Sequence, residues 1–198
     1  MTQQDIQKEI SIIREMVEKT RSEAAENGHF FIAIGIFSVF TTVLVGVLES
    51  FKLYNLTLPV LAMATIISGF IGYFTISRQE RQEKVKSYSK TICYKILFGC
   101  GIVGIMVVFL FPLLKYYSWE LTPVLVSLIL GIMVYSTGVI FELRFIQWCG
   151  TTWWLGAIIM ALVEGQRWPS ISMMILCIIV GFILPGYYLN RKYKIRSK

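Results

Sequence analysis

The chain has 198 residues, of which 56% are hydrophobic, and its 19 Lys or Arg against 12 Asp or Glu give a net charge of +7. The mean hydropathy is +0.65, and the hydrophobic fraction exceeds the roughly 45 to 50% of soluble domains. These values exclude an ordinary water-soluble globule. The basic charge does not by itself indicate nucleic acid, and no direct nucleic-acid binding is predicted, because membrane topology requires the same bias.

Residues 1–28 are predicted to form a cytoplasmic amphipathic helix. Apolar and small side chains recur there at alternating spacings of four and three, which places them on one helix stripe: Ile6, Ile10, Ile13, Val17, Thr20 and Ala24. Six acids against four bases in this segment disfavour binding to anionic lipid. The stripe is therefore an interaction surface, covered by the protein's own cytoplasmic face, by a second copy or by a cytosolic partner.

Six uncharged apolar stretches of 19 to 21 residues follow. A helix needs about 20 residues to cross the hydrocarbon core of a bilayer. We therefore predict an all-α polytopic membrane protein whose residues 29–189 form a six-helix transmembrane bundle. The predicted spans are Phe30–Leu48, Leu58–Ile76, Ile96–Leu114, Leu121–Phe141, Phe145–Val163 and Ser170–Leu189.

The distribution of Lys and Arg between the spans predicts the orientation. Sixteen of the 19 bases lie on the side of the two termini, and three lie on the other side, namely Lys52, Lys115 and Arg167. Bases concentrate on the cytoplasmic side of membrane proteins. The sequence therefore predicts a multi-pass protein of the inner, or plasma, membrane with both termini in the cytoplasm.

The spans are expected to pair as three hairpins that turn on the outer side. Each outer turn holds one Glu and one base within five residues, so we expect each acid to be neutralised locally, Glu49 by Lys52 for example. Small residues at a spacing of four favour close helix packing. They are Ala64, Ser68 and Gly72; Cys100 and Gly104; Ser127 and Gly131; and Ala157 and Ala161.

The fifth span carries polar and indole groups where a purely structural helix would favour Leu or Ile. Gln147, Thr151, Trp153 and Trp154 lie in its first half. They form either a face that binds a lipid or another amphipathic small molecule, or a set of hydrogen-bonding groups that join neighbouring helices. Both interpretations stay open on the sequence alone.

The rest of the chain offers little for catalysis or for a cofactor. The four Cys have no C-x-x-C spacing, and the single histidine, His29, lies at the start of the first span. We predict no enzyme activity, no cofactor and no metal. Pro185-Gly186 is expected to end the last helix, and residues 190–198 form a basic cytoplasmic tail that faces anionic headgroups.

Two stretches resemble an uncharacterised family of bacterial six-span integral membrane proteins, often encoded beside a winged-helix transcriptional regulator. The stretches are Ile12–Thr20 leading to Phe30-Phe31, and Leu184–Asn190. The resemblance covers the whole chain in layout and implies no catalytic or binding residue. It favours a membrane-bound regulatory or interaction role.

Two functions follow as hypotheses. The first is a non-enzymatic inner-membrane protein that presents its cytoplasmic helix for self-association or for docking of a cytosolic regulatory protein. The alternative is a small transporter or binding protein for a lipophilic or amphipathic compound, acting through the fifth span.

Overall fold

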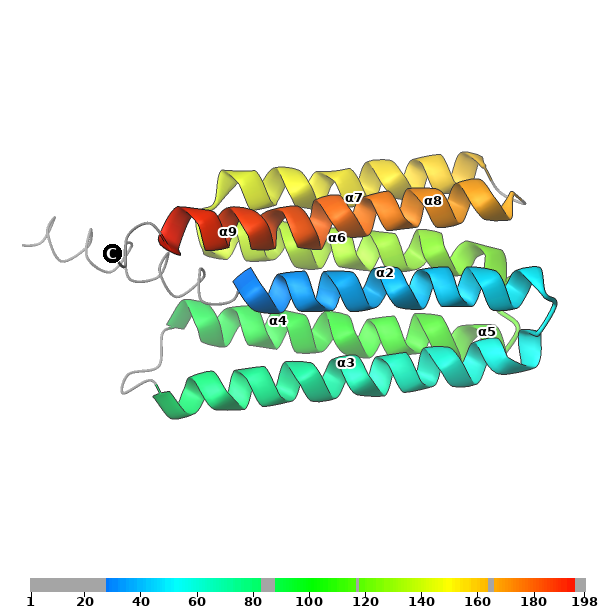
Figure 1. The fold of residues 1–198 in the computed structure, drawn as a ribbon, viewed down its shortest axis with the longest axis horizontal. Helices are drawn as coiled ribbons and strands as arrows, with labels where there is room; N and C mark the ends of the chain where they lie inside the picture. The colour runs from blue at the N-terminus through cyan, green and yellow to red at the C-terminus, as the bar shows by residue number, and fades with distance from the viewer. Residues whose placement is uncertain (1–27, 83–87, 117, 164–165, 195–198) are drawn as a thin grey trace, which may run out of the picture.

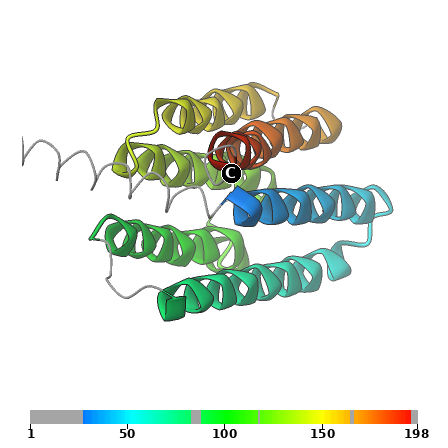
Figure 2. The ribbon, with the colours of Figure 1, turned by 60° about the vertical axis from the view of Figure 1, so that its left-hand side comes forward.

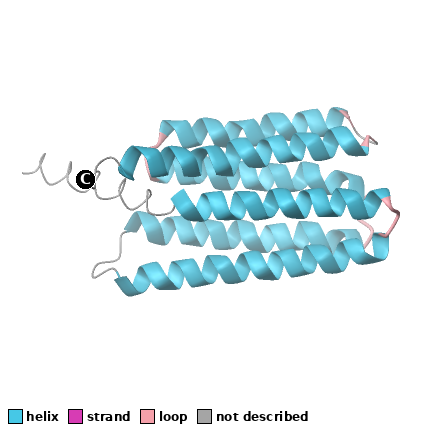
Figure 3. Ribbon diagram, viewed as in Figure 1, coloured by secondary structure: helices cyan, strands magenta, loops and turns pink. Residues whose placement is uncertain are grey.

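A computed structural model describes residues 28–82, 88–116, 118–163 and 166–194. Within these ranges the protein is helical and has no strand (Figure 3). The amphipathic stripe of residues 6–24 lies outside the described residues. The elements are α2 (Gly28–Ser50), α3 (Tyr54–Gln82), α4 (Tyr88–Ile105), η1 (Met106–Leu110), α5 (Phe111–Leu113), η2 (Trp119–Leu121), α6 (Thr122–Ile140), α7 (Arg144–Leu162), α8 (Arg167–Ile178), η3 (Ile179–Ile183) and α9 (Leu184–Lys194).

Six of the resulting rods are long and apolar enough to cross a membrane, which confirms the prediction of an all-α, multi-pass protein. Their ranges are Phe31–Ser50, Asn55–Thr75, Thr91–Leu113, Trp119–Ile140, Arg144–Leu162 and Arg167–Arg191. The rods run side by side along the long axis of the molecule (Figure 1). We call the end that carries Gly28 and Lys194 the terminal end, and the other end the turn end.

Two of the six rods contain a π-helical segment just before a proline. In the last span the Leu184 N–H bonds to the Ile179 oxygen, five residues back, and Pro185 follows. In the third span Phe111 bonds in the same way to Met106, ahead of Pro112. Proline has no N–H to donate and clashes with the carbonyl four residues earlier, and a wider turn relieves both conflicts. The prediction that Pro185-Gly186 ends the last helix is therefore wrong, since helix continues to Lys194.

The first and last spans lie antiparallel along their whole length. A Cβ atom built on Gly28 would lie 2.8 Å from Asn190 Oδ1, and one built on Gly46 would contact Ile171 near the turn end. Arg167 Nη1 donates a hydrogen bond to the Glu49 backbone oxygen at 2.8 Å, and Arg167 Nε lies 3.5 Å from Glu49 Oε2. Glu49 thus takes its basic partner from α8 and not from its own turn.

The helices α6 and α7 approach each other most closely, across a tight turn at Phe141–Leu143. A Cβ on Gly138 would lie 2.6 Å from the Gln147 nitrogen, and one on Gly150 would lie 2.7 Å from the Tyr135 backbone. These glycines let the two backbones touch, as small residues do in membrane helices. The scheme of three hairpins stays a prediction, because this closest pair joins the second predicted hairpin to the third.

The helix α3 lies at one margin of the bundle in both views (Figures 1 and 2). Only 6% of the residues in its apolar window are buried, against 39% in the window of α7. A Cβ on Gly69 of α3, or on Gly99, Gly101 or Gly104 of α4, would meet no atom within 4 Å. The close contacts made through glycine therefore lie among α2, α6, α7 and the last span, while α4 contributes the buried Cys93 to the core.

Candidate functional site

Gln147 forms a bridge between α7 and α6 near the terminal end. Its Nε2 donates a hydrogen bond to the Gly138 oxygen at 3.2 Å. The same oxygen accepts the Leu143 N–H at 2.9 Å, where the chain turns between the two helices. The last carbonyl groups of a helix have no N–H partner within that helix, and inside a membrane they need another donor. The Gln147 amide supplies one such donor and so stabilises the turn between α6 and α7.

Trp154 also faces α6. Its ring centroid lies 5.4 Å from that of Tyr135, with the planes tilted by 38°. Its indole nitrogen lies against Gly131, where a Cβ atom would collide with it. Thr151 lies between Gln147 and Trp154 in the sequence, and its hydroxyl donates to the Trp148 oxygen of its own helix at 2.8 Å.

Trp153 points in another direction, into the space between α7 and the last span. Its side chain is 0% exposed and meets Phe182 edge-on at a centroid distance of 5.6 Å. The indole nitrogen packs against Gly181, inside the π-helical segment η3. This N–H has no hydrogen-bond partner in the described part of the chain.

The four residues predicted as a possible ligand face thus divide between two neighbours. Gln147 and Trp154 contact α6, while Trp153 contacts the last span. Consecutive helix positions are rotated by about 100°, so Trp153 and Trp154 cannot share one face. Hydrogen bonds between helices account for Gln147, and a ligand role for the set stays a prediction.

A shallow apolar recess lies between α7 and α8 towards the turn end. Its volume is about 210 Å³, and its lining includes Met160, Met173 and Leu176. Ser172, whose hydroxyl bonds to the Trp168 oxygen of its own helix, is the polar side chain in that lining. The recess suits an acyl chain or another apolar group.

The residues that the structure describes include no cluster of three His, Cys, Asp or Glu side chains placed to hold a metal ion. Cys93, Cys100, Cys149 and Cys177 are free thiols within the apolar rods. Cys177 packs against Gly156, where a Cβ atom would collide with its sulfur. Its small side chain therefore fits a close contact between α7 and α8.

Apart from Gly131, which packs against Trp154, the sequence did not single out the partners of the two tryptophans. Tyr135 lies on α6, Gly181 and Phe182 lie in η3, and each reaches its tryptophan from another span. Glycines at positions 131 and 138, spaced by seven, were the available signal for a close neighbour of α7.

Comparison of the chain with models of known protein families, with curated proteins and with solved structures finds no match.

Proposed function

We propose that this is a non-enzymatic inner-membrane protein whose bundle holds residues 1–28 in position for self-association or for docking of a cytosolic regulatory protein. Both termini lie in the cytoplasm in this proposal. The observation that carries it is the contact at Gly28, where the segment joins the bundle. A Cβ on Gly28 would lie 2.9 Å from the Gly186 backbone oxygen, and one on Gly186 would lie 2.7 Å from the Gly28 oxygen.

This contact supports a presenting role because it fixes the point from which the amphipathic segment leaves the bundle. Gly28 is buried, and α2 is fastened to the last span at both ends, by Gly28 at one and by Glu49 at the other. A rigid base reduces the freedom that a partner-binding helix must lose on association. The resemblance to membrane proteins encoded beside a transcriptional regulator points to the same class of function.

Substitutions on the two sides of the predicted amphipathic helix test the proposal. I10S/V17S removes two apolar side chains from the stripe, and K8S/E15S changes two residues on the opposite side without altering the net charge. Crosslinking in native membranes followed by mass spectrometry reports both self-association and partners. We expect the crosslinks of residues 1–28 to disappear in I10S/V17S and to persist in K8S/E15S.

The thermal unfolding of both variants should match that of the wild type, since the four substituted positions lie outside the bundle in this proposal. If I10S/V17S keeps every crosslink of the wild-type protein, the proposal is wrong.

The second candidate is a carrier or binding protein for a lipophilic compound. It is favoured by the unpartnered Trp153 N–H beside η3 and by the apolar recess between α7 and α8. A ligand that accepts a hydrogen bond from Trp153 should stabilise the wild type but not W153F. If no lipophilic compound in a screen raises the unfolding temperature of the wild type, this candidate loses its support.

A further inference from the structure

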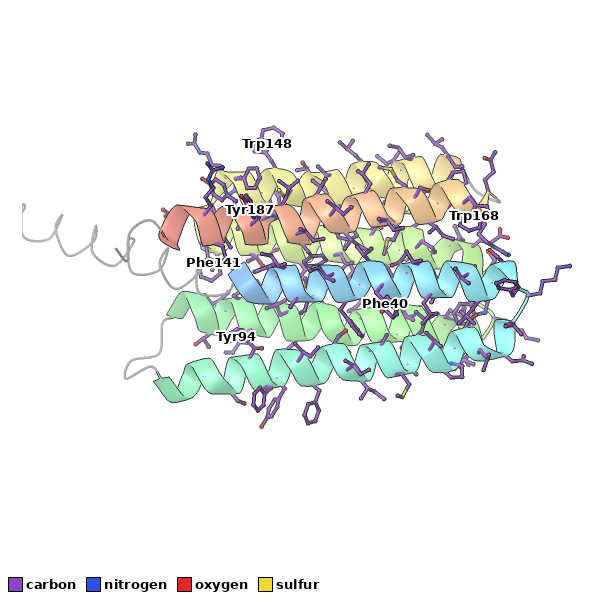
Figure 4. All side chains as sticks on the ribbon, viewed as in Figure 1. Phe40, Tyr94, Phe141, Trp148, Trp168 and Tyr187 are labelled. Carbon is purple, nitrogen blue, oxygen red and sulfur yellow. The ribbon has the colours of Figure 1, made fainter. Side chains whose placement is uncertain are left out.

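Two rows of aromatic and basic side chains run side by side at the terminal end, one on α7 and one on α9. On α7 they are Arg144, Phe145 and Trp148, and on α9 they are Tyr187, Tyr188 and Arg191. The rows meet where the rings of Phe145 and Tyr188 lie 4.7 Å apart and tilted by 32°. Figure 4 shows Trp148 and Tyr187 in the part of the bundle nearest the chain termini.

The remaining members of both rows are directed outward. Trp148 is 72% exposed and Tyr187 is 59% exposed, while Arg144 and Arg191 are also exposed. Arg144 precedes Trp148 by four residues, and Tyr187 precedes Arg191 by four, so each arginine shares a helix face with its aromatic residue. Since Phe145 and Tyr188 join the rows, the four outward side chains lie on one continuous surface of the α7–α9 pair.

The depths of these groups match those of a membrane–water interface. Arg144 and Arg191 each lie within three residues, or about 5 Å along a helix, of the aromatic contact. Both are nearer the terminal end than that contact. Tryptophan and tyrosine concentrate at headgroup depth in membrane proteins. Deeper along the same helices, Leu155 is 59% exposed and Leu184 is 42% exposed.

The two arginines also differ from the arginine at the turn end. Arg167 is engaged by Glu49, whereas neither Arg144 nor Arg191 has an ion-pair or hydrogen-bond partner among the described residues. A guanidinium binds phosphate oxygens in a bidentate manner. Glu142 lies two residues before Arg144 but forms no ion pair with it. Two guanidinium groups without an ion-pair partner among the described residues, next to an aromatic belt, are complementary to a negative headgroup.

We infer that the α7–α9 surface binds an anionic phospholipid. Arg144 and Arg191 hold the phosphate group or groups, Trp148 and Tyr187 lie against the glycerol region, and the acyl chains follow Leu155 and Leu184. The order of base, aromatic ring and aliphatic side chain along both helices distinguishes this occupant from a soluble phosphate compound, which has no chains to place.

Lipid titration of the purified full-length protein tests this inference. The protein in neutral detergent is mixed with cardiolipin, phosphatidylglycerol or phosphatidylcholine, and bound lipid is measured by native mass spectrometry. We expect the wild type to retain the two anionic lipids in preference to phosphatidylcholine. R144Q/R191Q should bind them roughly 30-fold more weakly. The removal of each base near an anionic headgroup weakens binding by about fivefold, and the two factors multiply.

A matched control separates this site from general charge attraction. K84Q/K86Q removes two positive charges from the loop between the second and third spans, on the same predicted side of the membrane. We expect its lipid affinity to stay close to that of the wild type. An equal loss in both variants would show that the attraction is diffuse and would overturn the inference.

One further measurement distinguishes a lipid headgroup from a soluble phosphate compound as the ligand. A second tests the aromatic residues in a variant whose folding is checked by its unfolding temperature. Glycerol 1-phosphate should not displace bound phosphatidylglycerol, and displacement at comparable concentration would identify a soluble phosphate as the ligand instead. W148A/Y187A should weaken retention of the anionic lipids while keeping the wild-type unfolding temperature in neutral detergent. Retention of phosphatidylcholine as strong as that of cardiolipin would contradict the inference.

Discussion

Trp153 is the largest fully buried side chain in the described structure. It fills the space between α7 and the last span with no exposed surface, and Gly181 provides the room for its indole nitrogen. Its N–H is buried without a partner. A buried unpaired donor costs about 1 to 3 kcal/mol of stability. The ring therefore contributes to stability through its volume, and its N–H contributes no hydrogen bond within the described part of the chain.

Two substitutions at Trp153 separate volume from hydrogen bonding. W153A should destabilise the protein by about 3 to 5 kcal/mol, because a large buried ring leaves a cavity. W153F removes the unpaired donor and keeps most of the ring, so its stability should change by only about 1 kcal/mol. Unfolding in mixed micelles of neutral detergent and sodium dodecyl sulfate measures both. A loss in W153F as large as that in W153A would show that the N–H has a partner in the folded protein.

The sequence predicted which residues of the fifth span are unusual but not what each one does. Gln147 and Trp154 bond to and pack on α6, as the interpretation of interhelical hydrogen bonding and packing would have it. Trp153 does not fit the interpretation of hydrogen-bonding groups that join neighbouring helices, because its indole N–H has no partner among the described residues. The difference arises because the identity of the facing residue, Gly181, depends on the register of two spans that are distant in the chain.

At the level of the elements, glycine decides which helices pack closely. Gly138 and Gly150 let α6 and α7 touch, and Gly28 and Gly46 do the same for α2 and the last span. Gly69 in α3 and the glycines of α4 face open space. Six apolar spans could be predicted from the distribution of apolar and charged residues along the chain, whereas the pairing of the first span with the last could not. Hydropathy gives the length of a helix and says nothing about its neighbours.

A pair of Gly→Ala substitutions tests this division. G150A places a methyl group 2.7 Å from the Tyr135 backbone, which cannot move aside as a flexible side chain would. We expect a loss of about 1 to 3 kcal/mol from overpacking. G101A meets no atom within 4 Å and should cause no loss of stability, because alanine also has a higher helix propensity than glycine. Unfolding midpoints in the same micelles provide the comparison.

If G101A proves as damaging as G150A, the open face of α4 is in contact with something in the native protein. A second copy of the chain would be the first occupant to examine. The oligomeric state of G101A, measured by light scattering in detergent, would then differ from that of the wild type.

At the scale of the whole molecule, the termini of the described chain lie at one end and the turns after α2, α5 and α7 lie at the other (Figure 1). The excess of bases on the side of the termini predicts that this end faces the cytoplasm. The fold shows which segments lie at the same end of the bundle. The distribution of Lys and Arg predicts which of the two ends faces the cytoplasm.

Labelling of single cysteines tests that orientation. In a chain whose four native Cys are replaced, Glu120→Cys should react in intact cells with a maleimide that cannot cross membranes, because Glu120 lies at the turn end. Lys198→Cys should react only after the cells are opened. Labelling of Lys198→Cys from outside would reverse the proposed orientation and would place residues 1–28 beyond the reach of a cytosolic partner.

The pairing of α2 with the last span has a consequence for biosynthesis. Glu49 and Arg167 are separated by 118 positions along the chain, so α2 is made well before the span that packs against it is translated. Until then its glycine-rich side faces lipid or the insertion machinery. Completion of the described bundle is therefore tied to the arrival of the span that begins at Arg167, and a chain that stops before Arg167 leaves α2 without this partner.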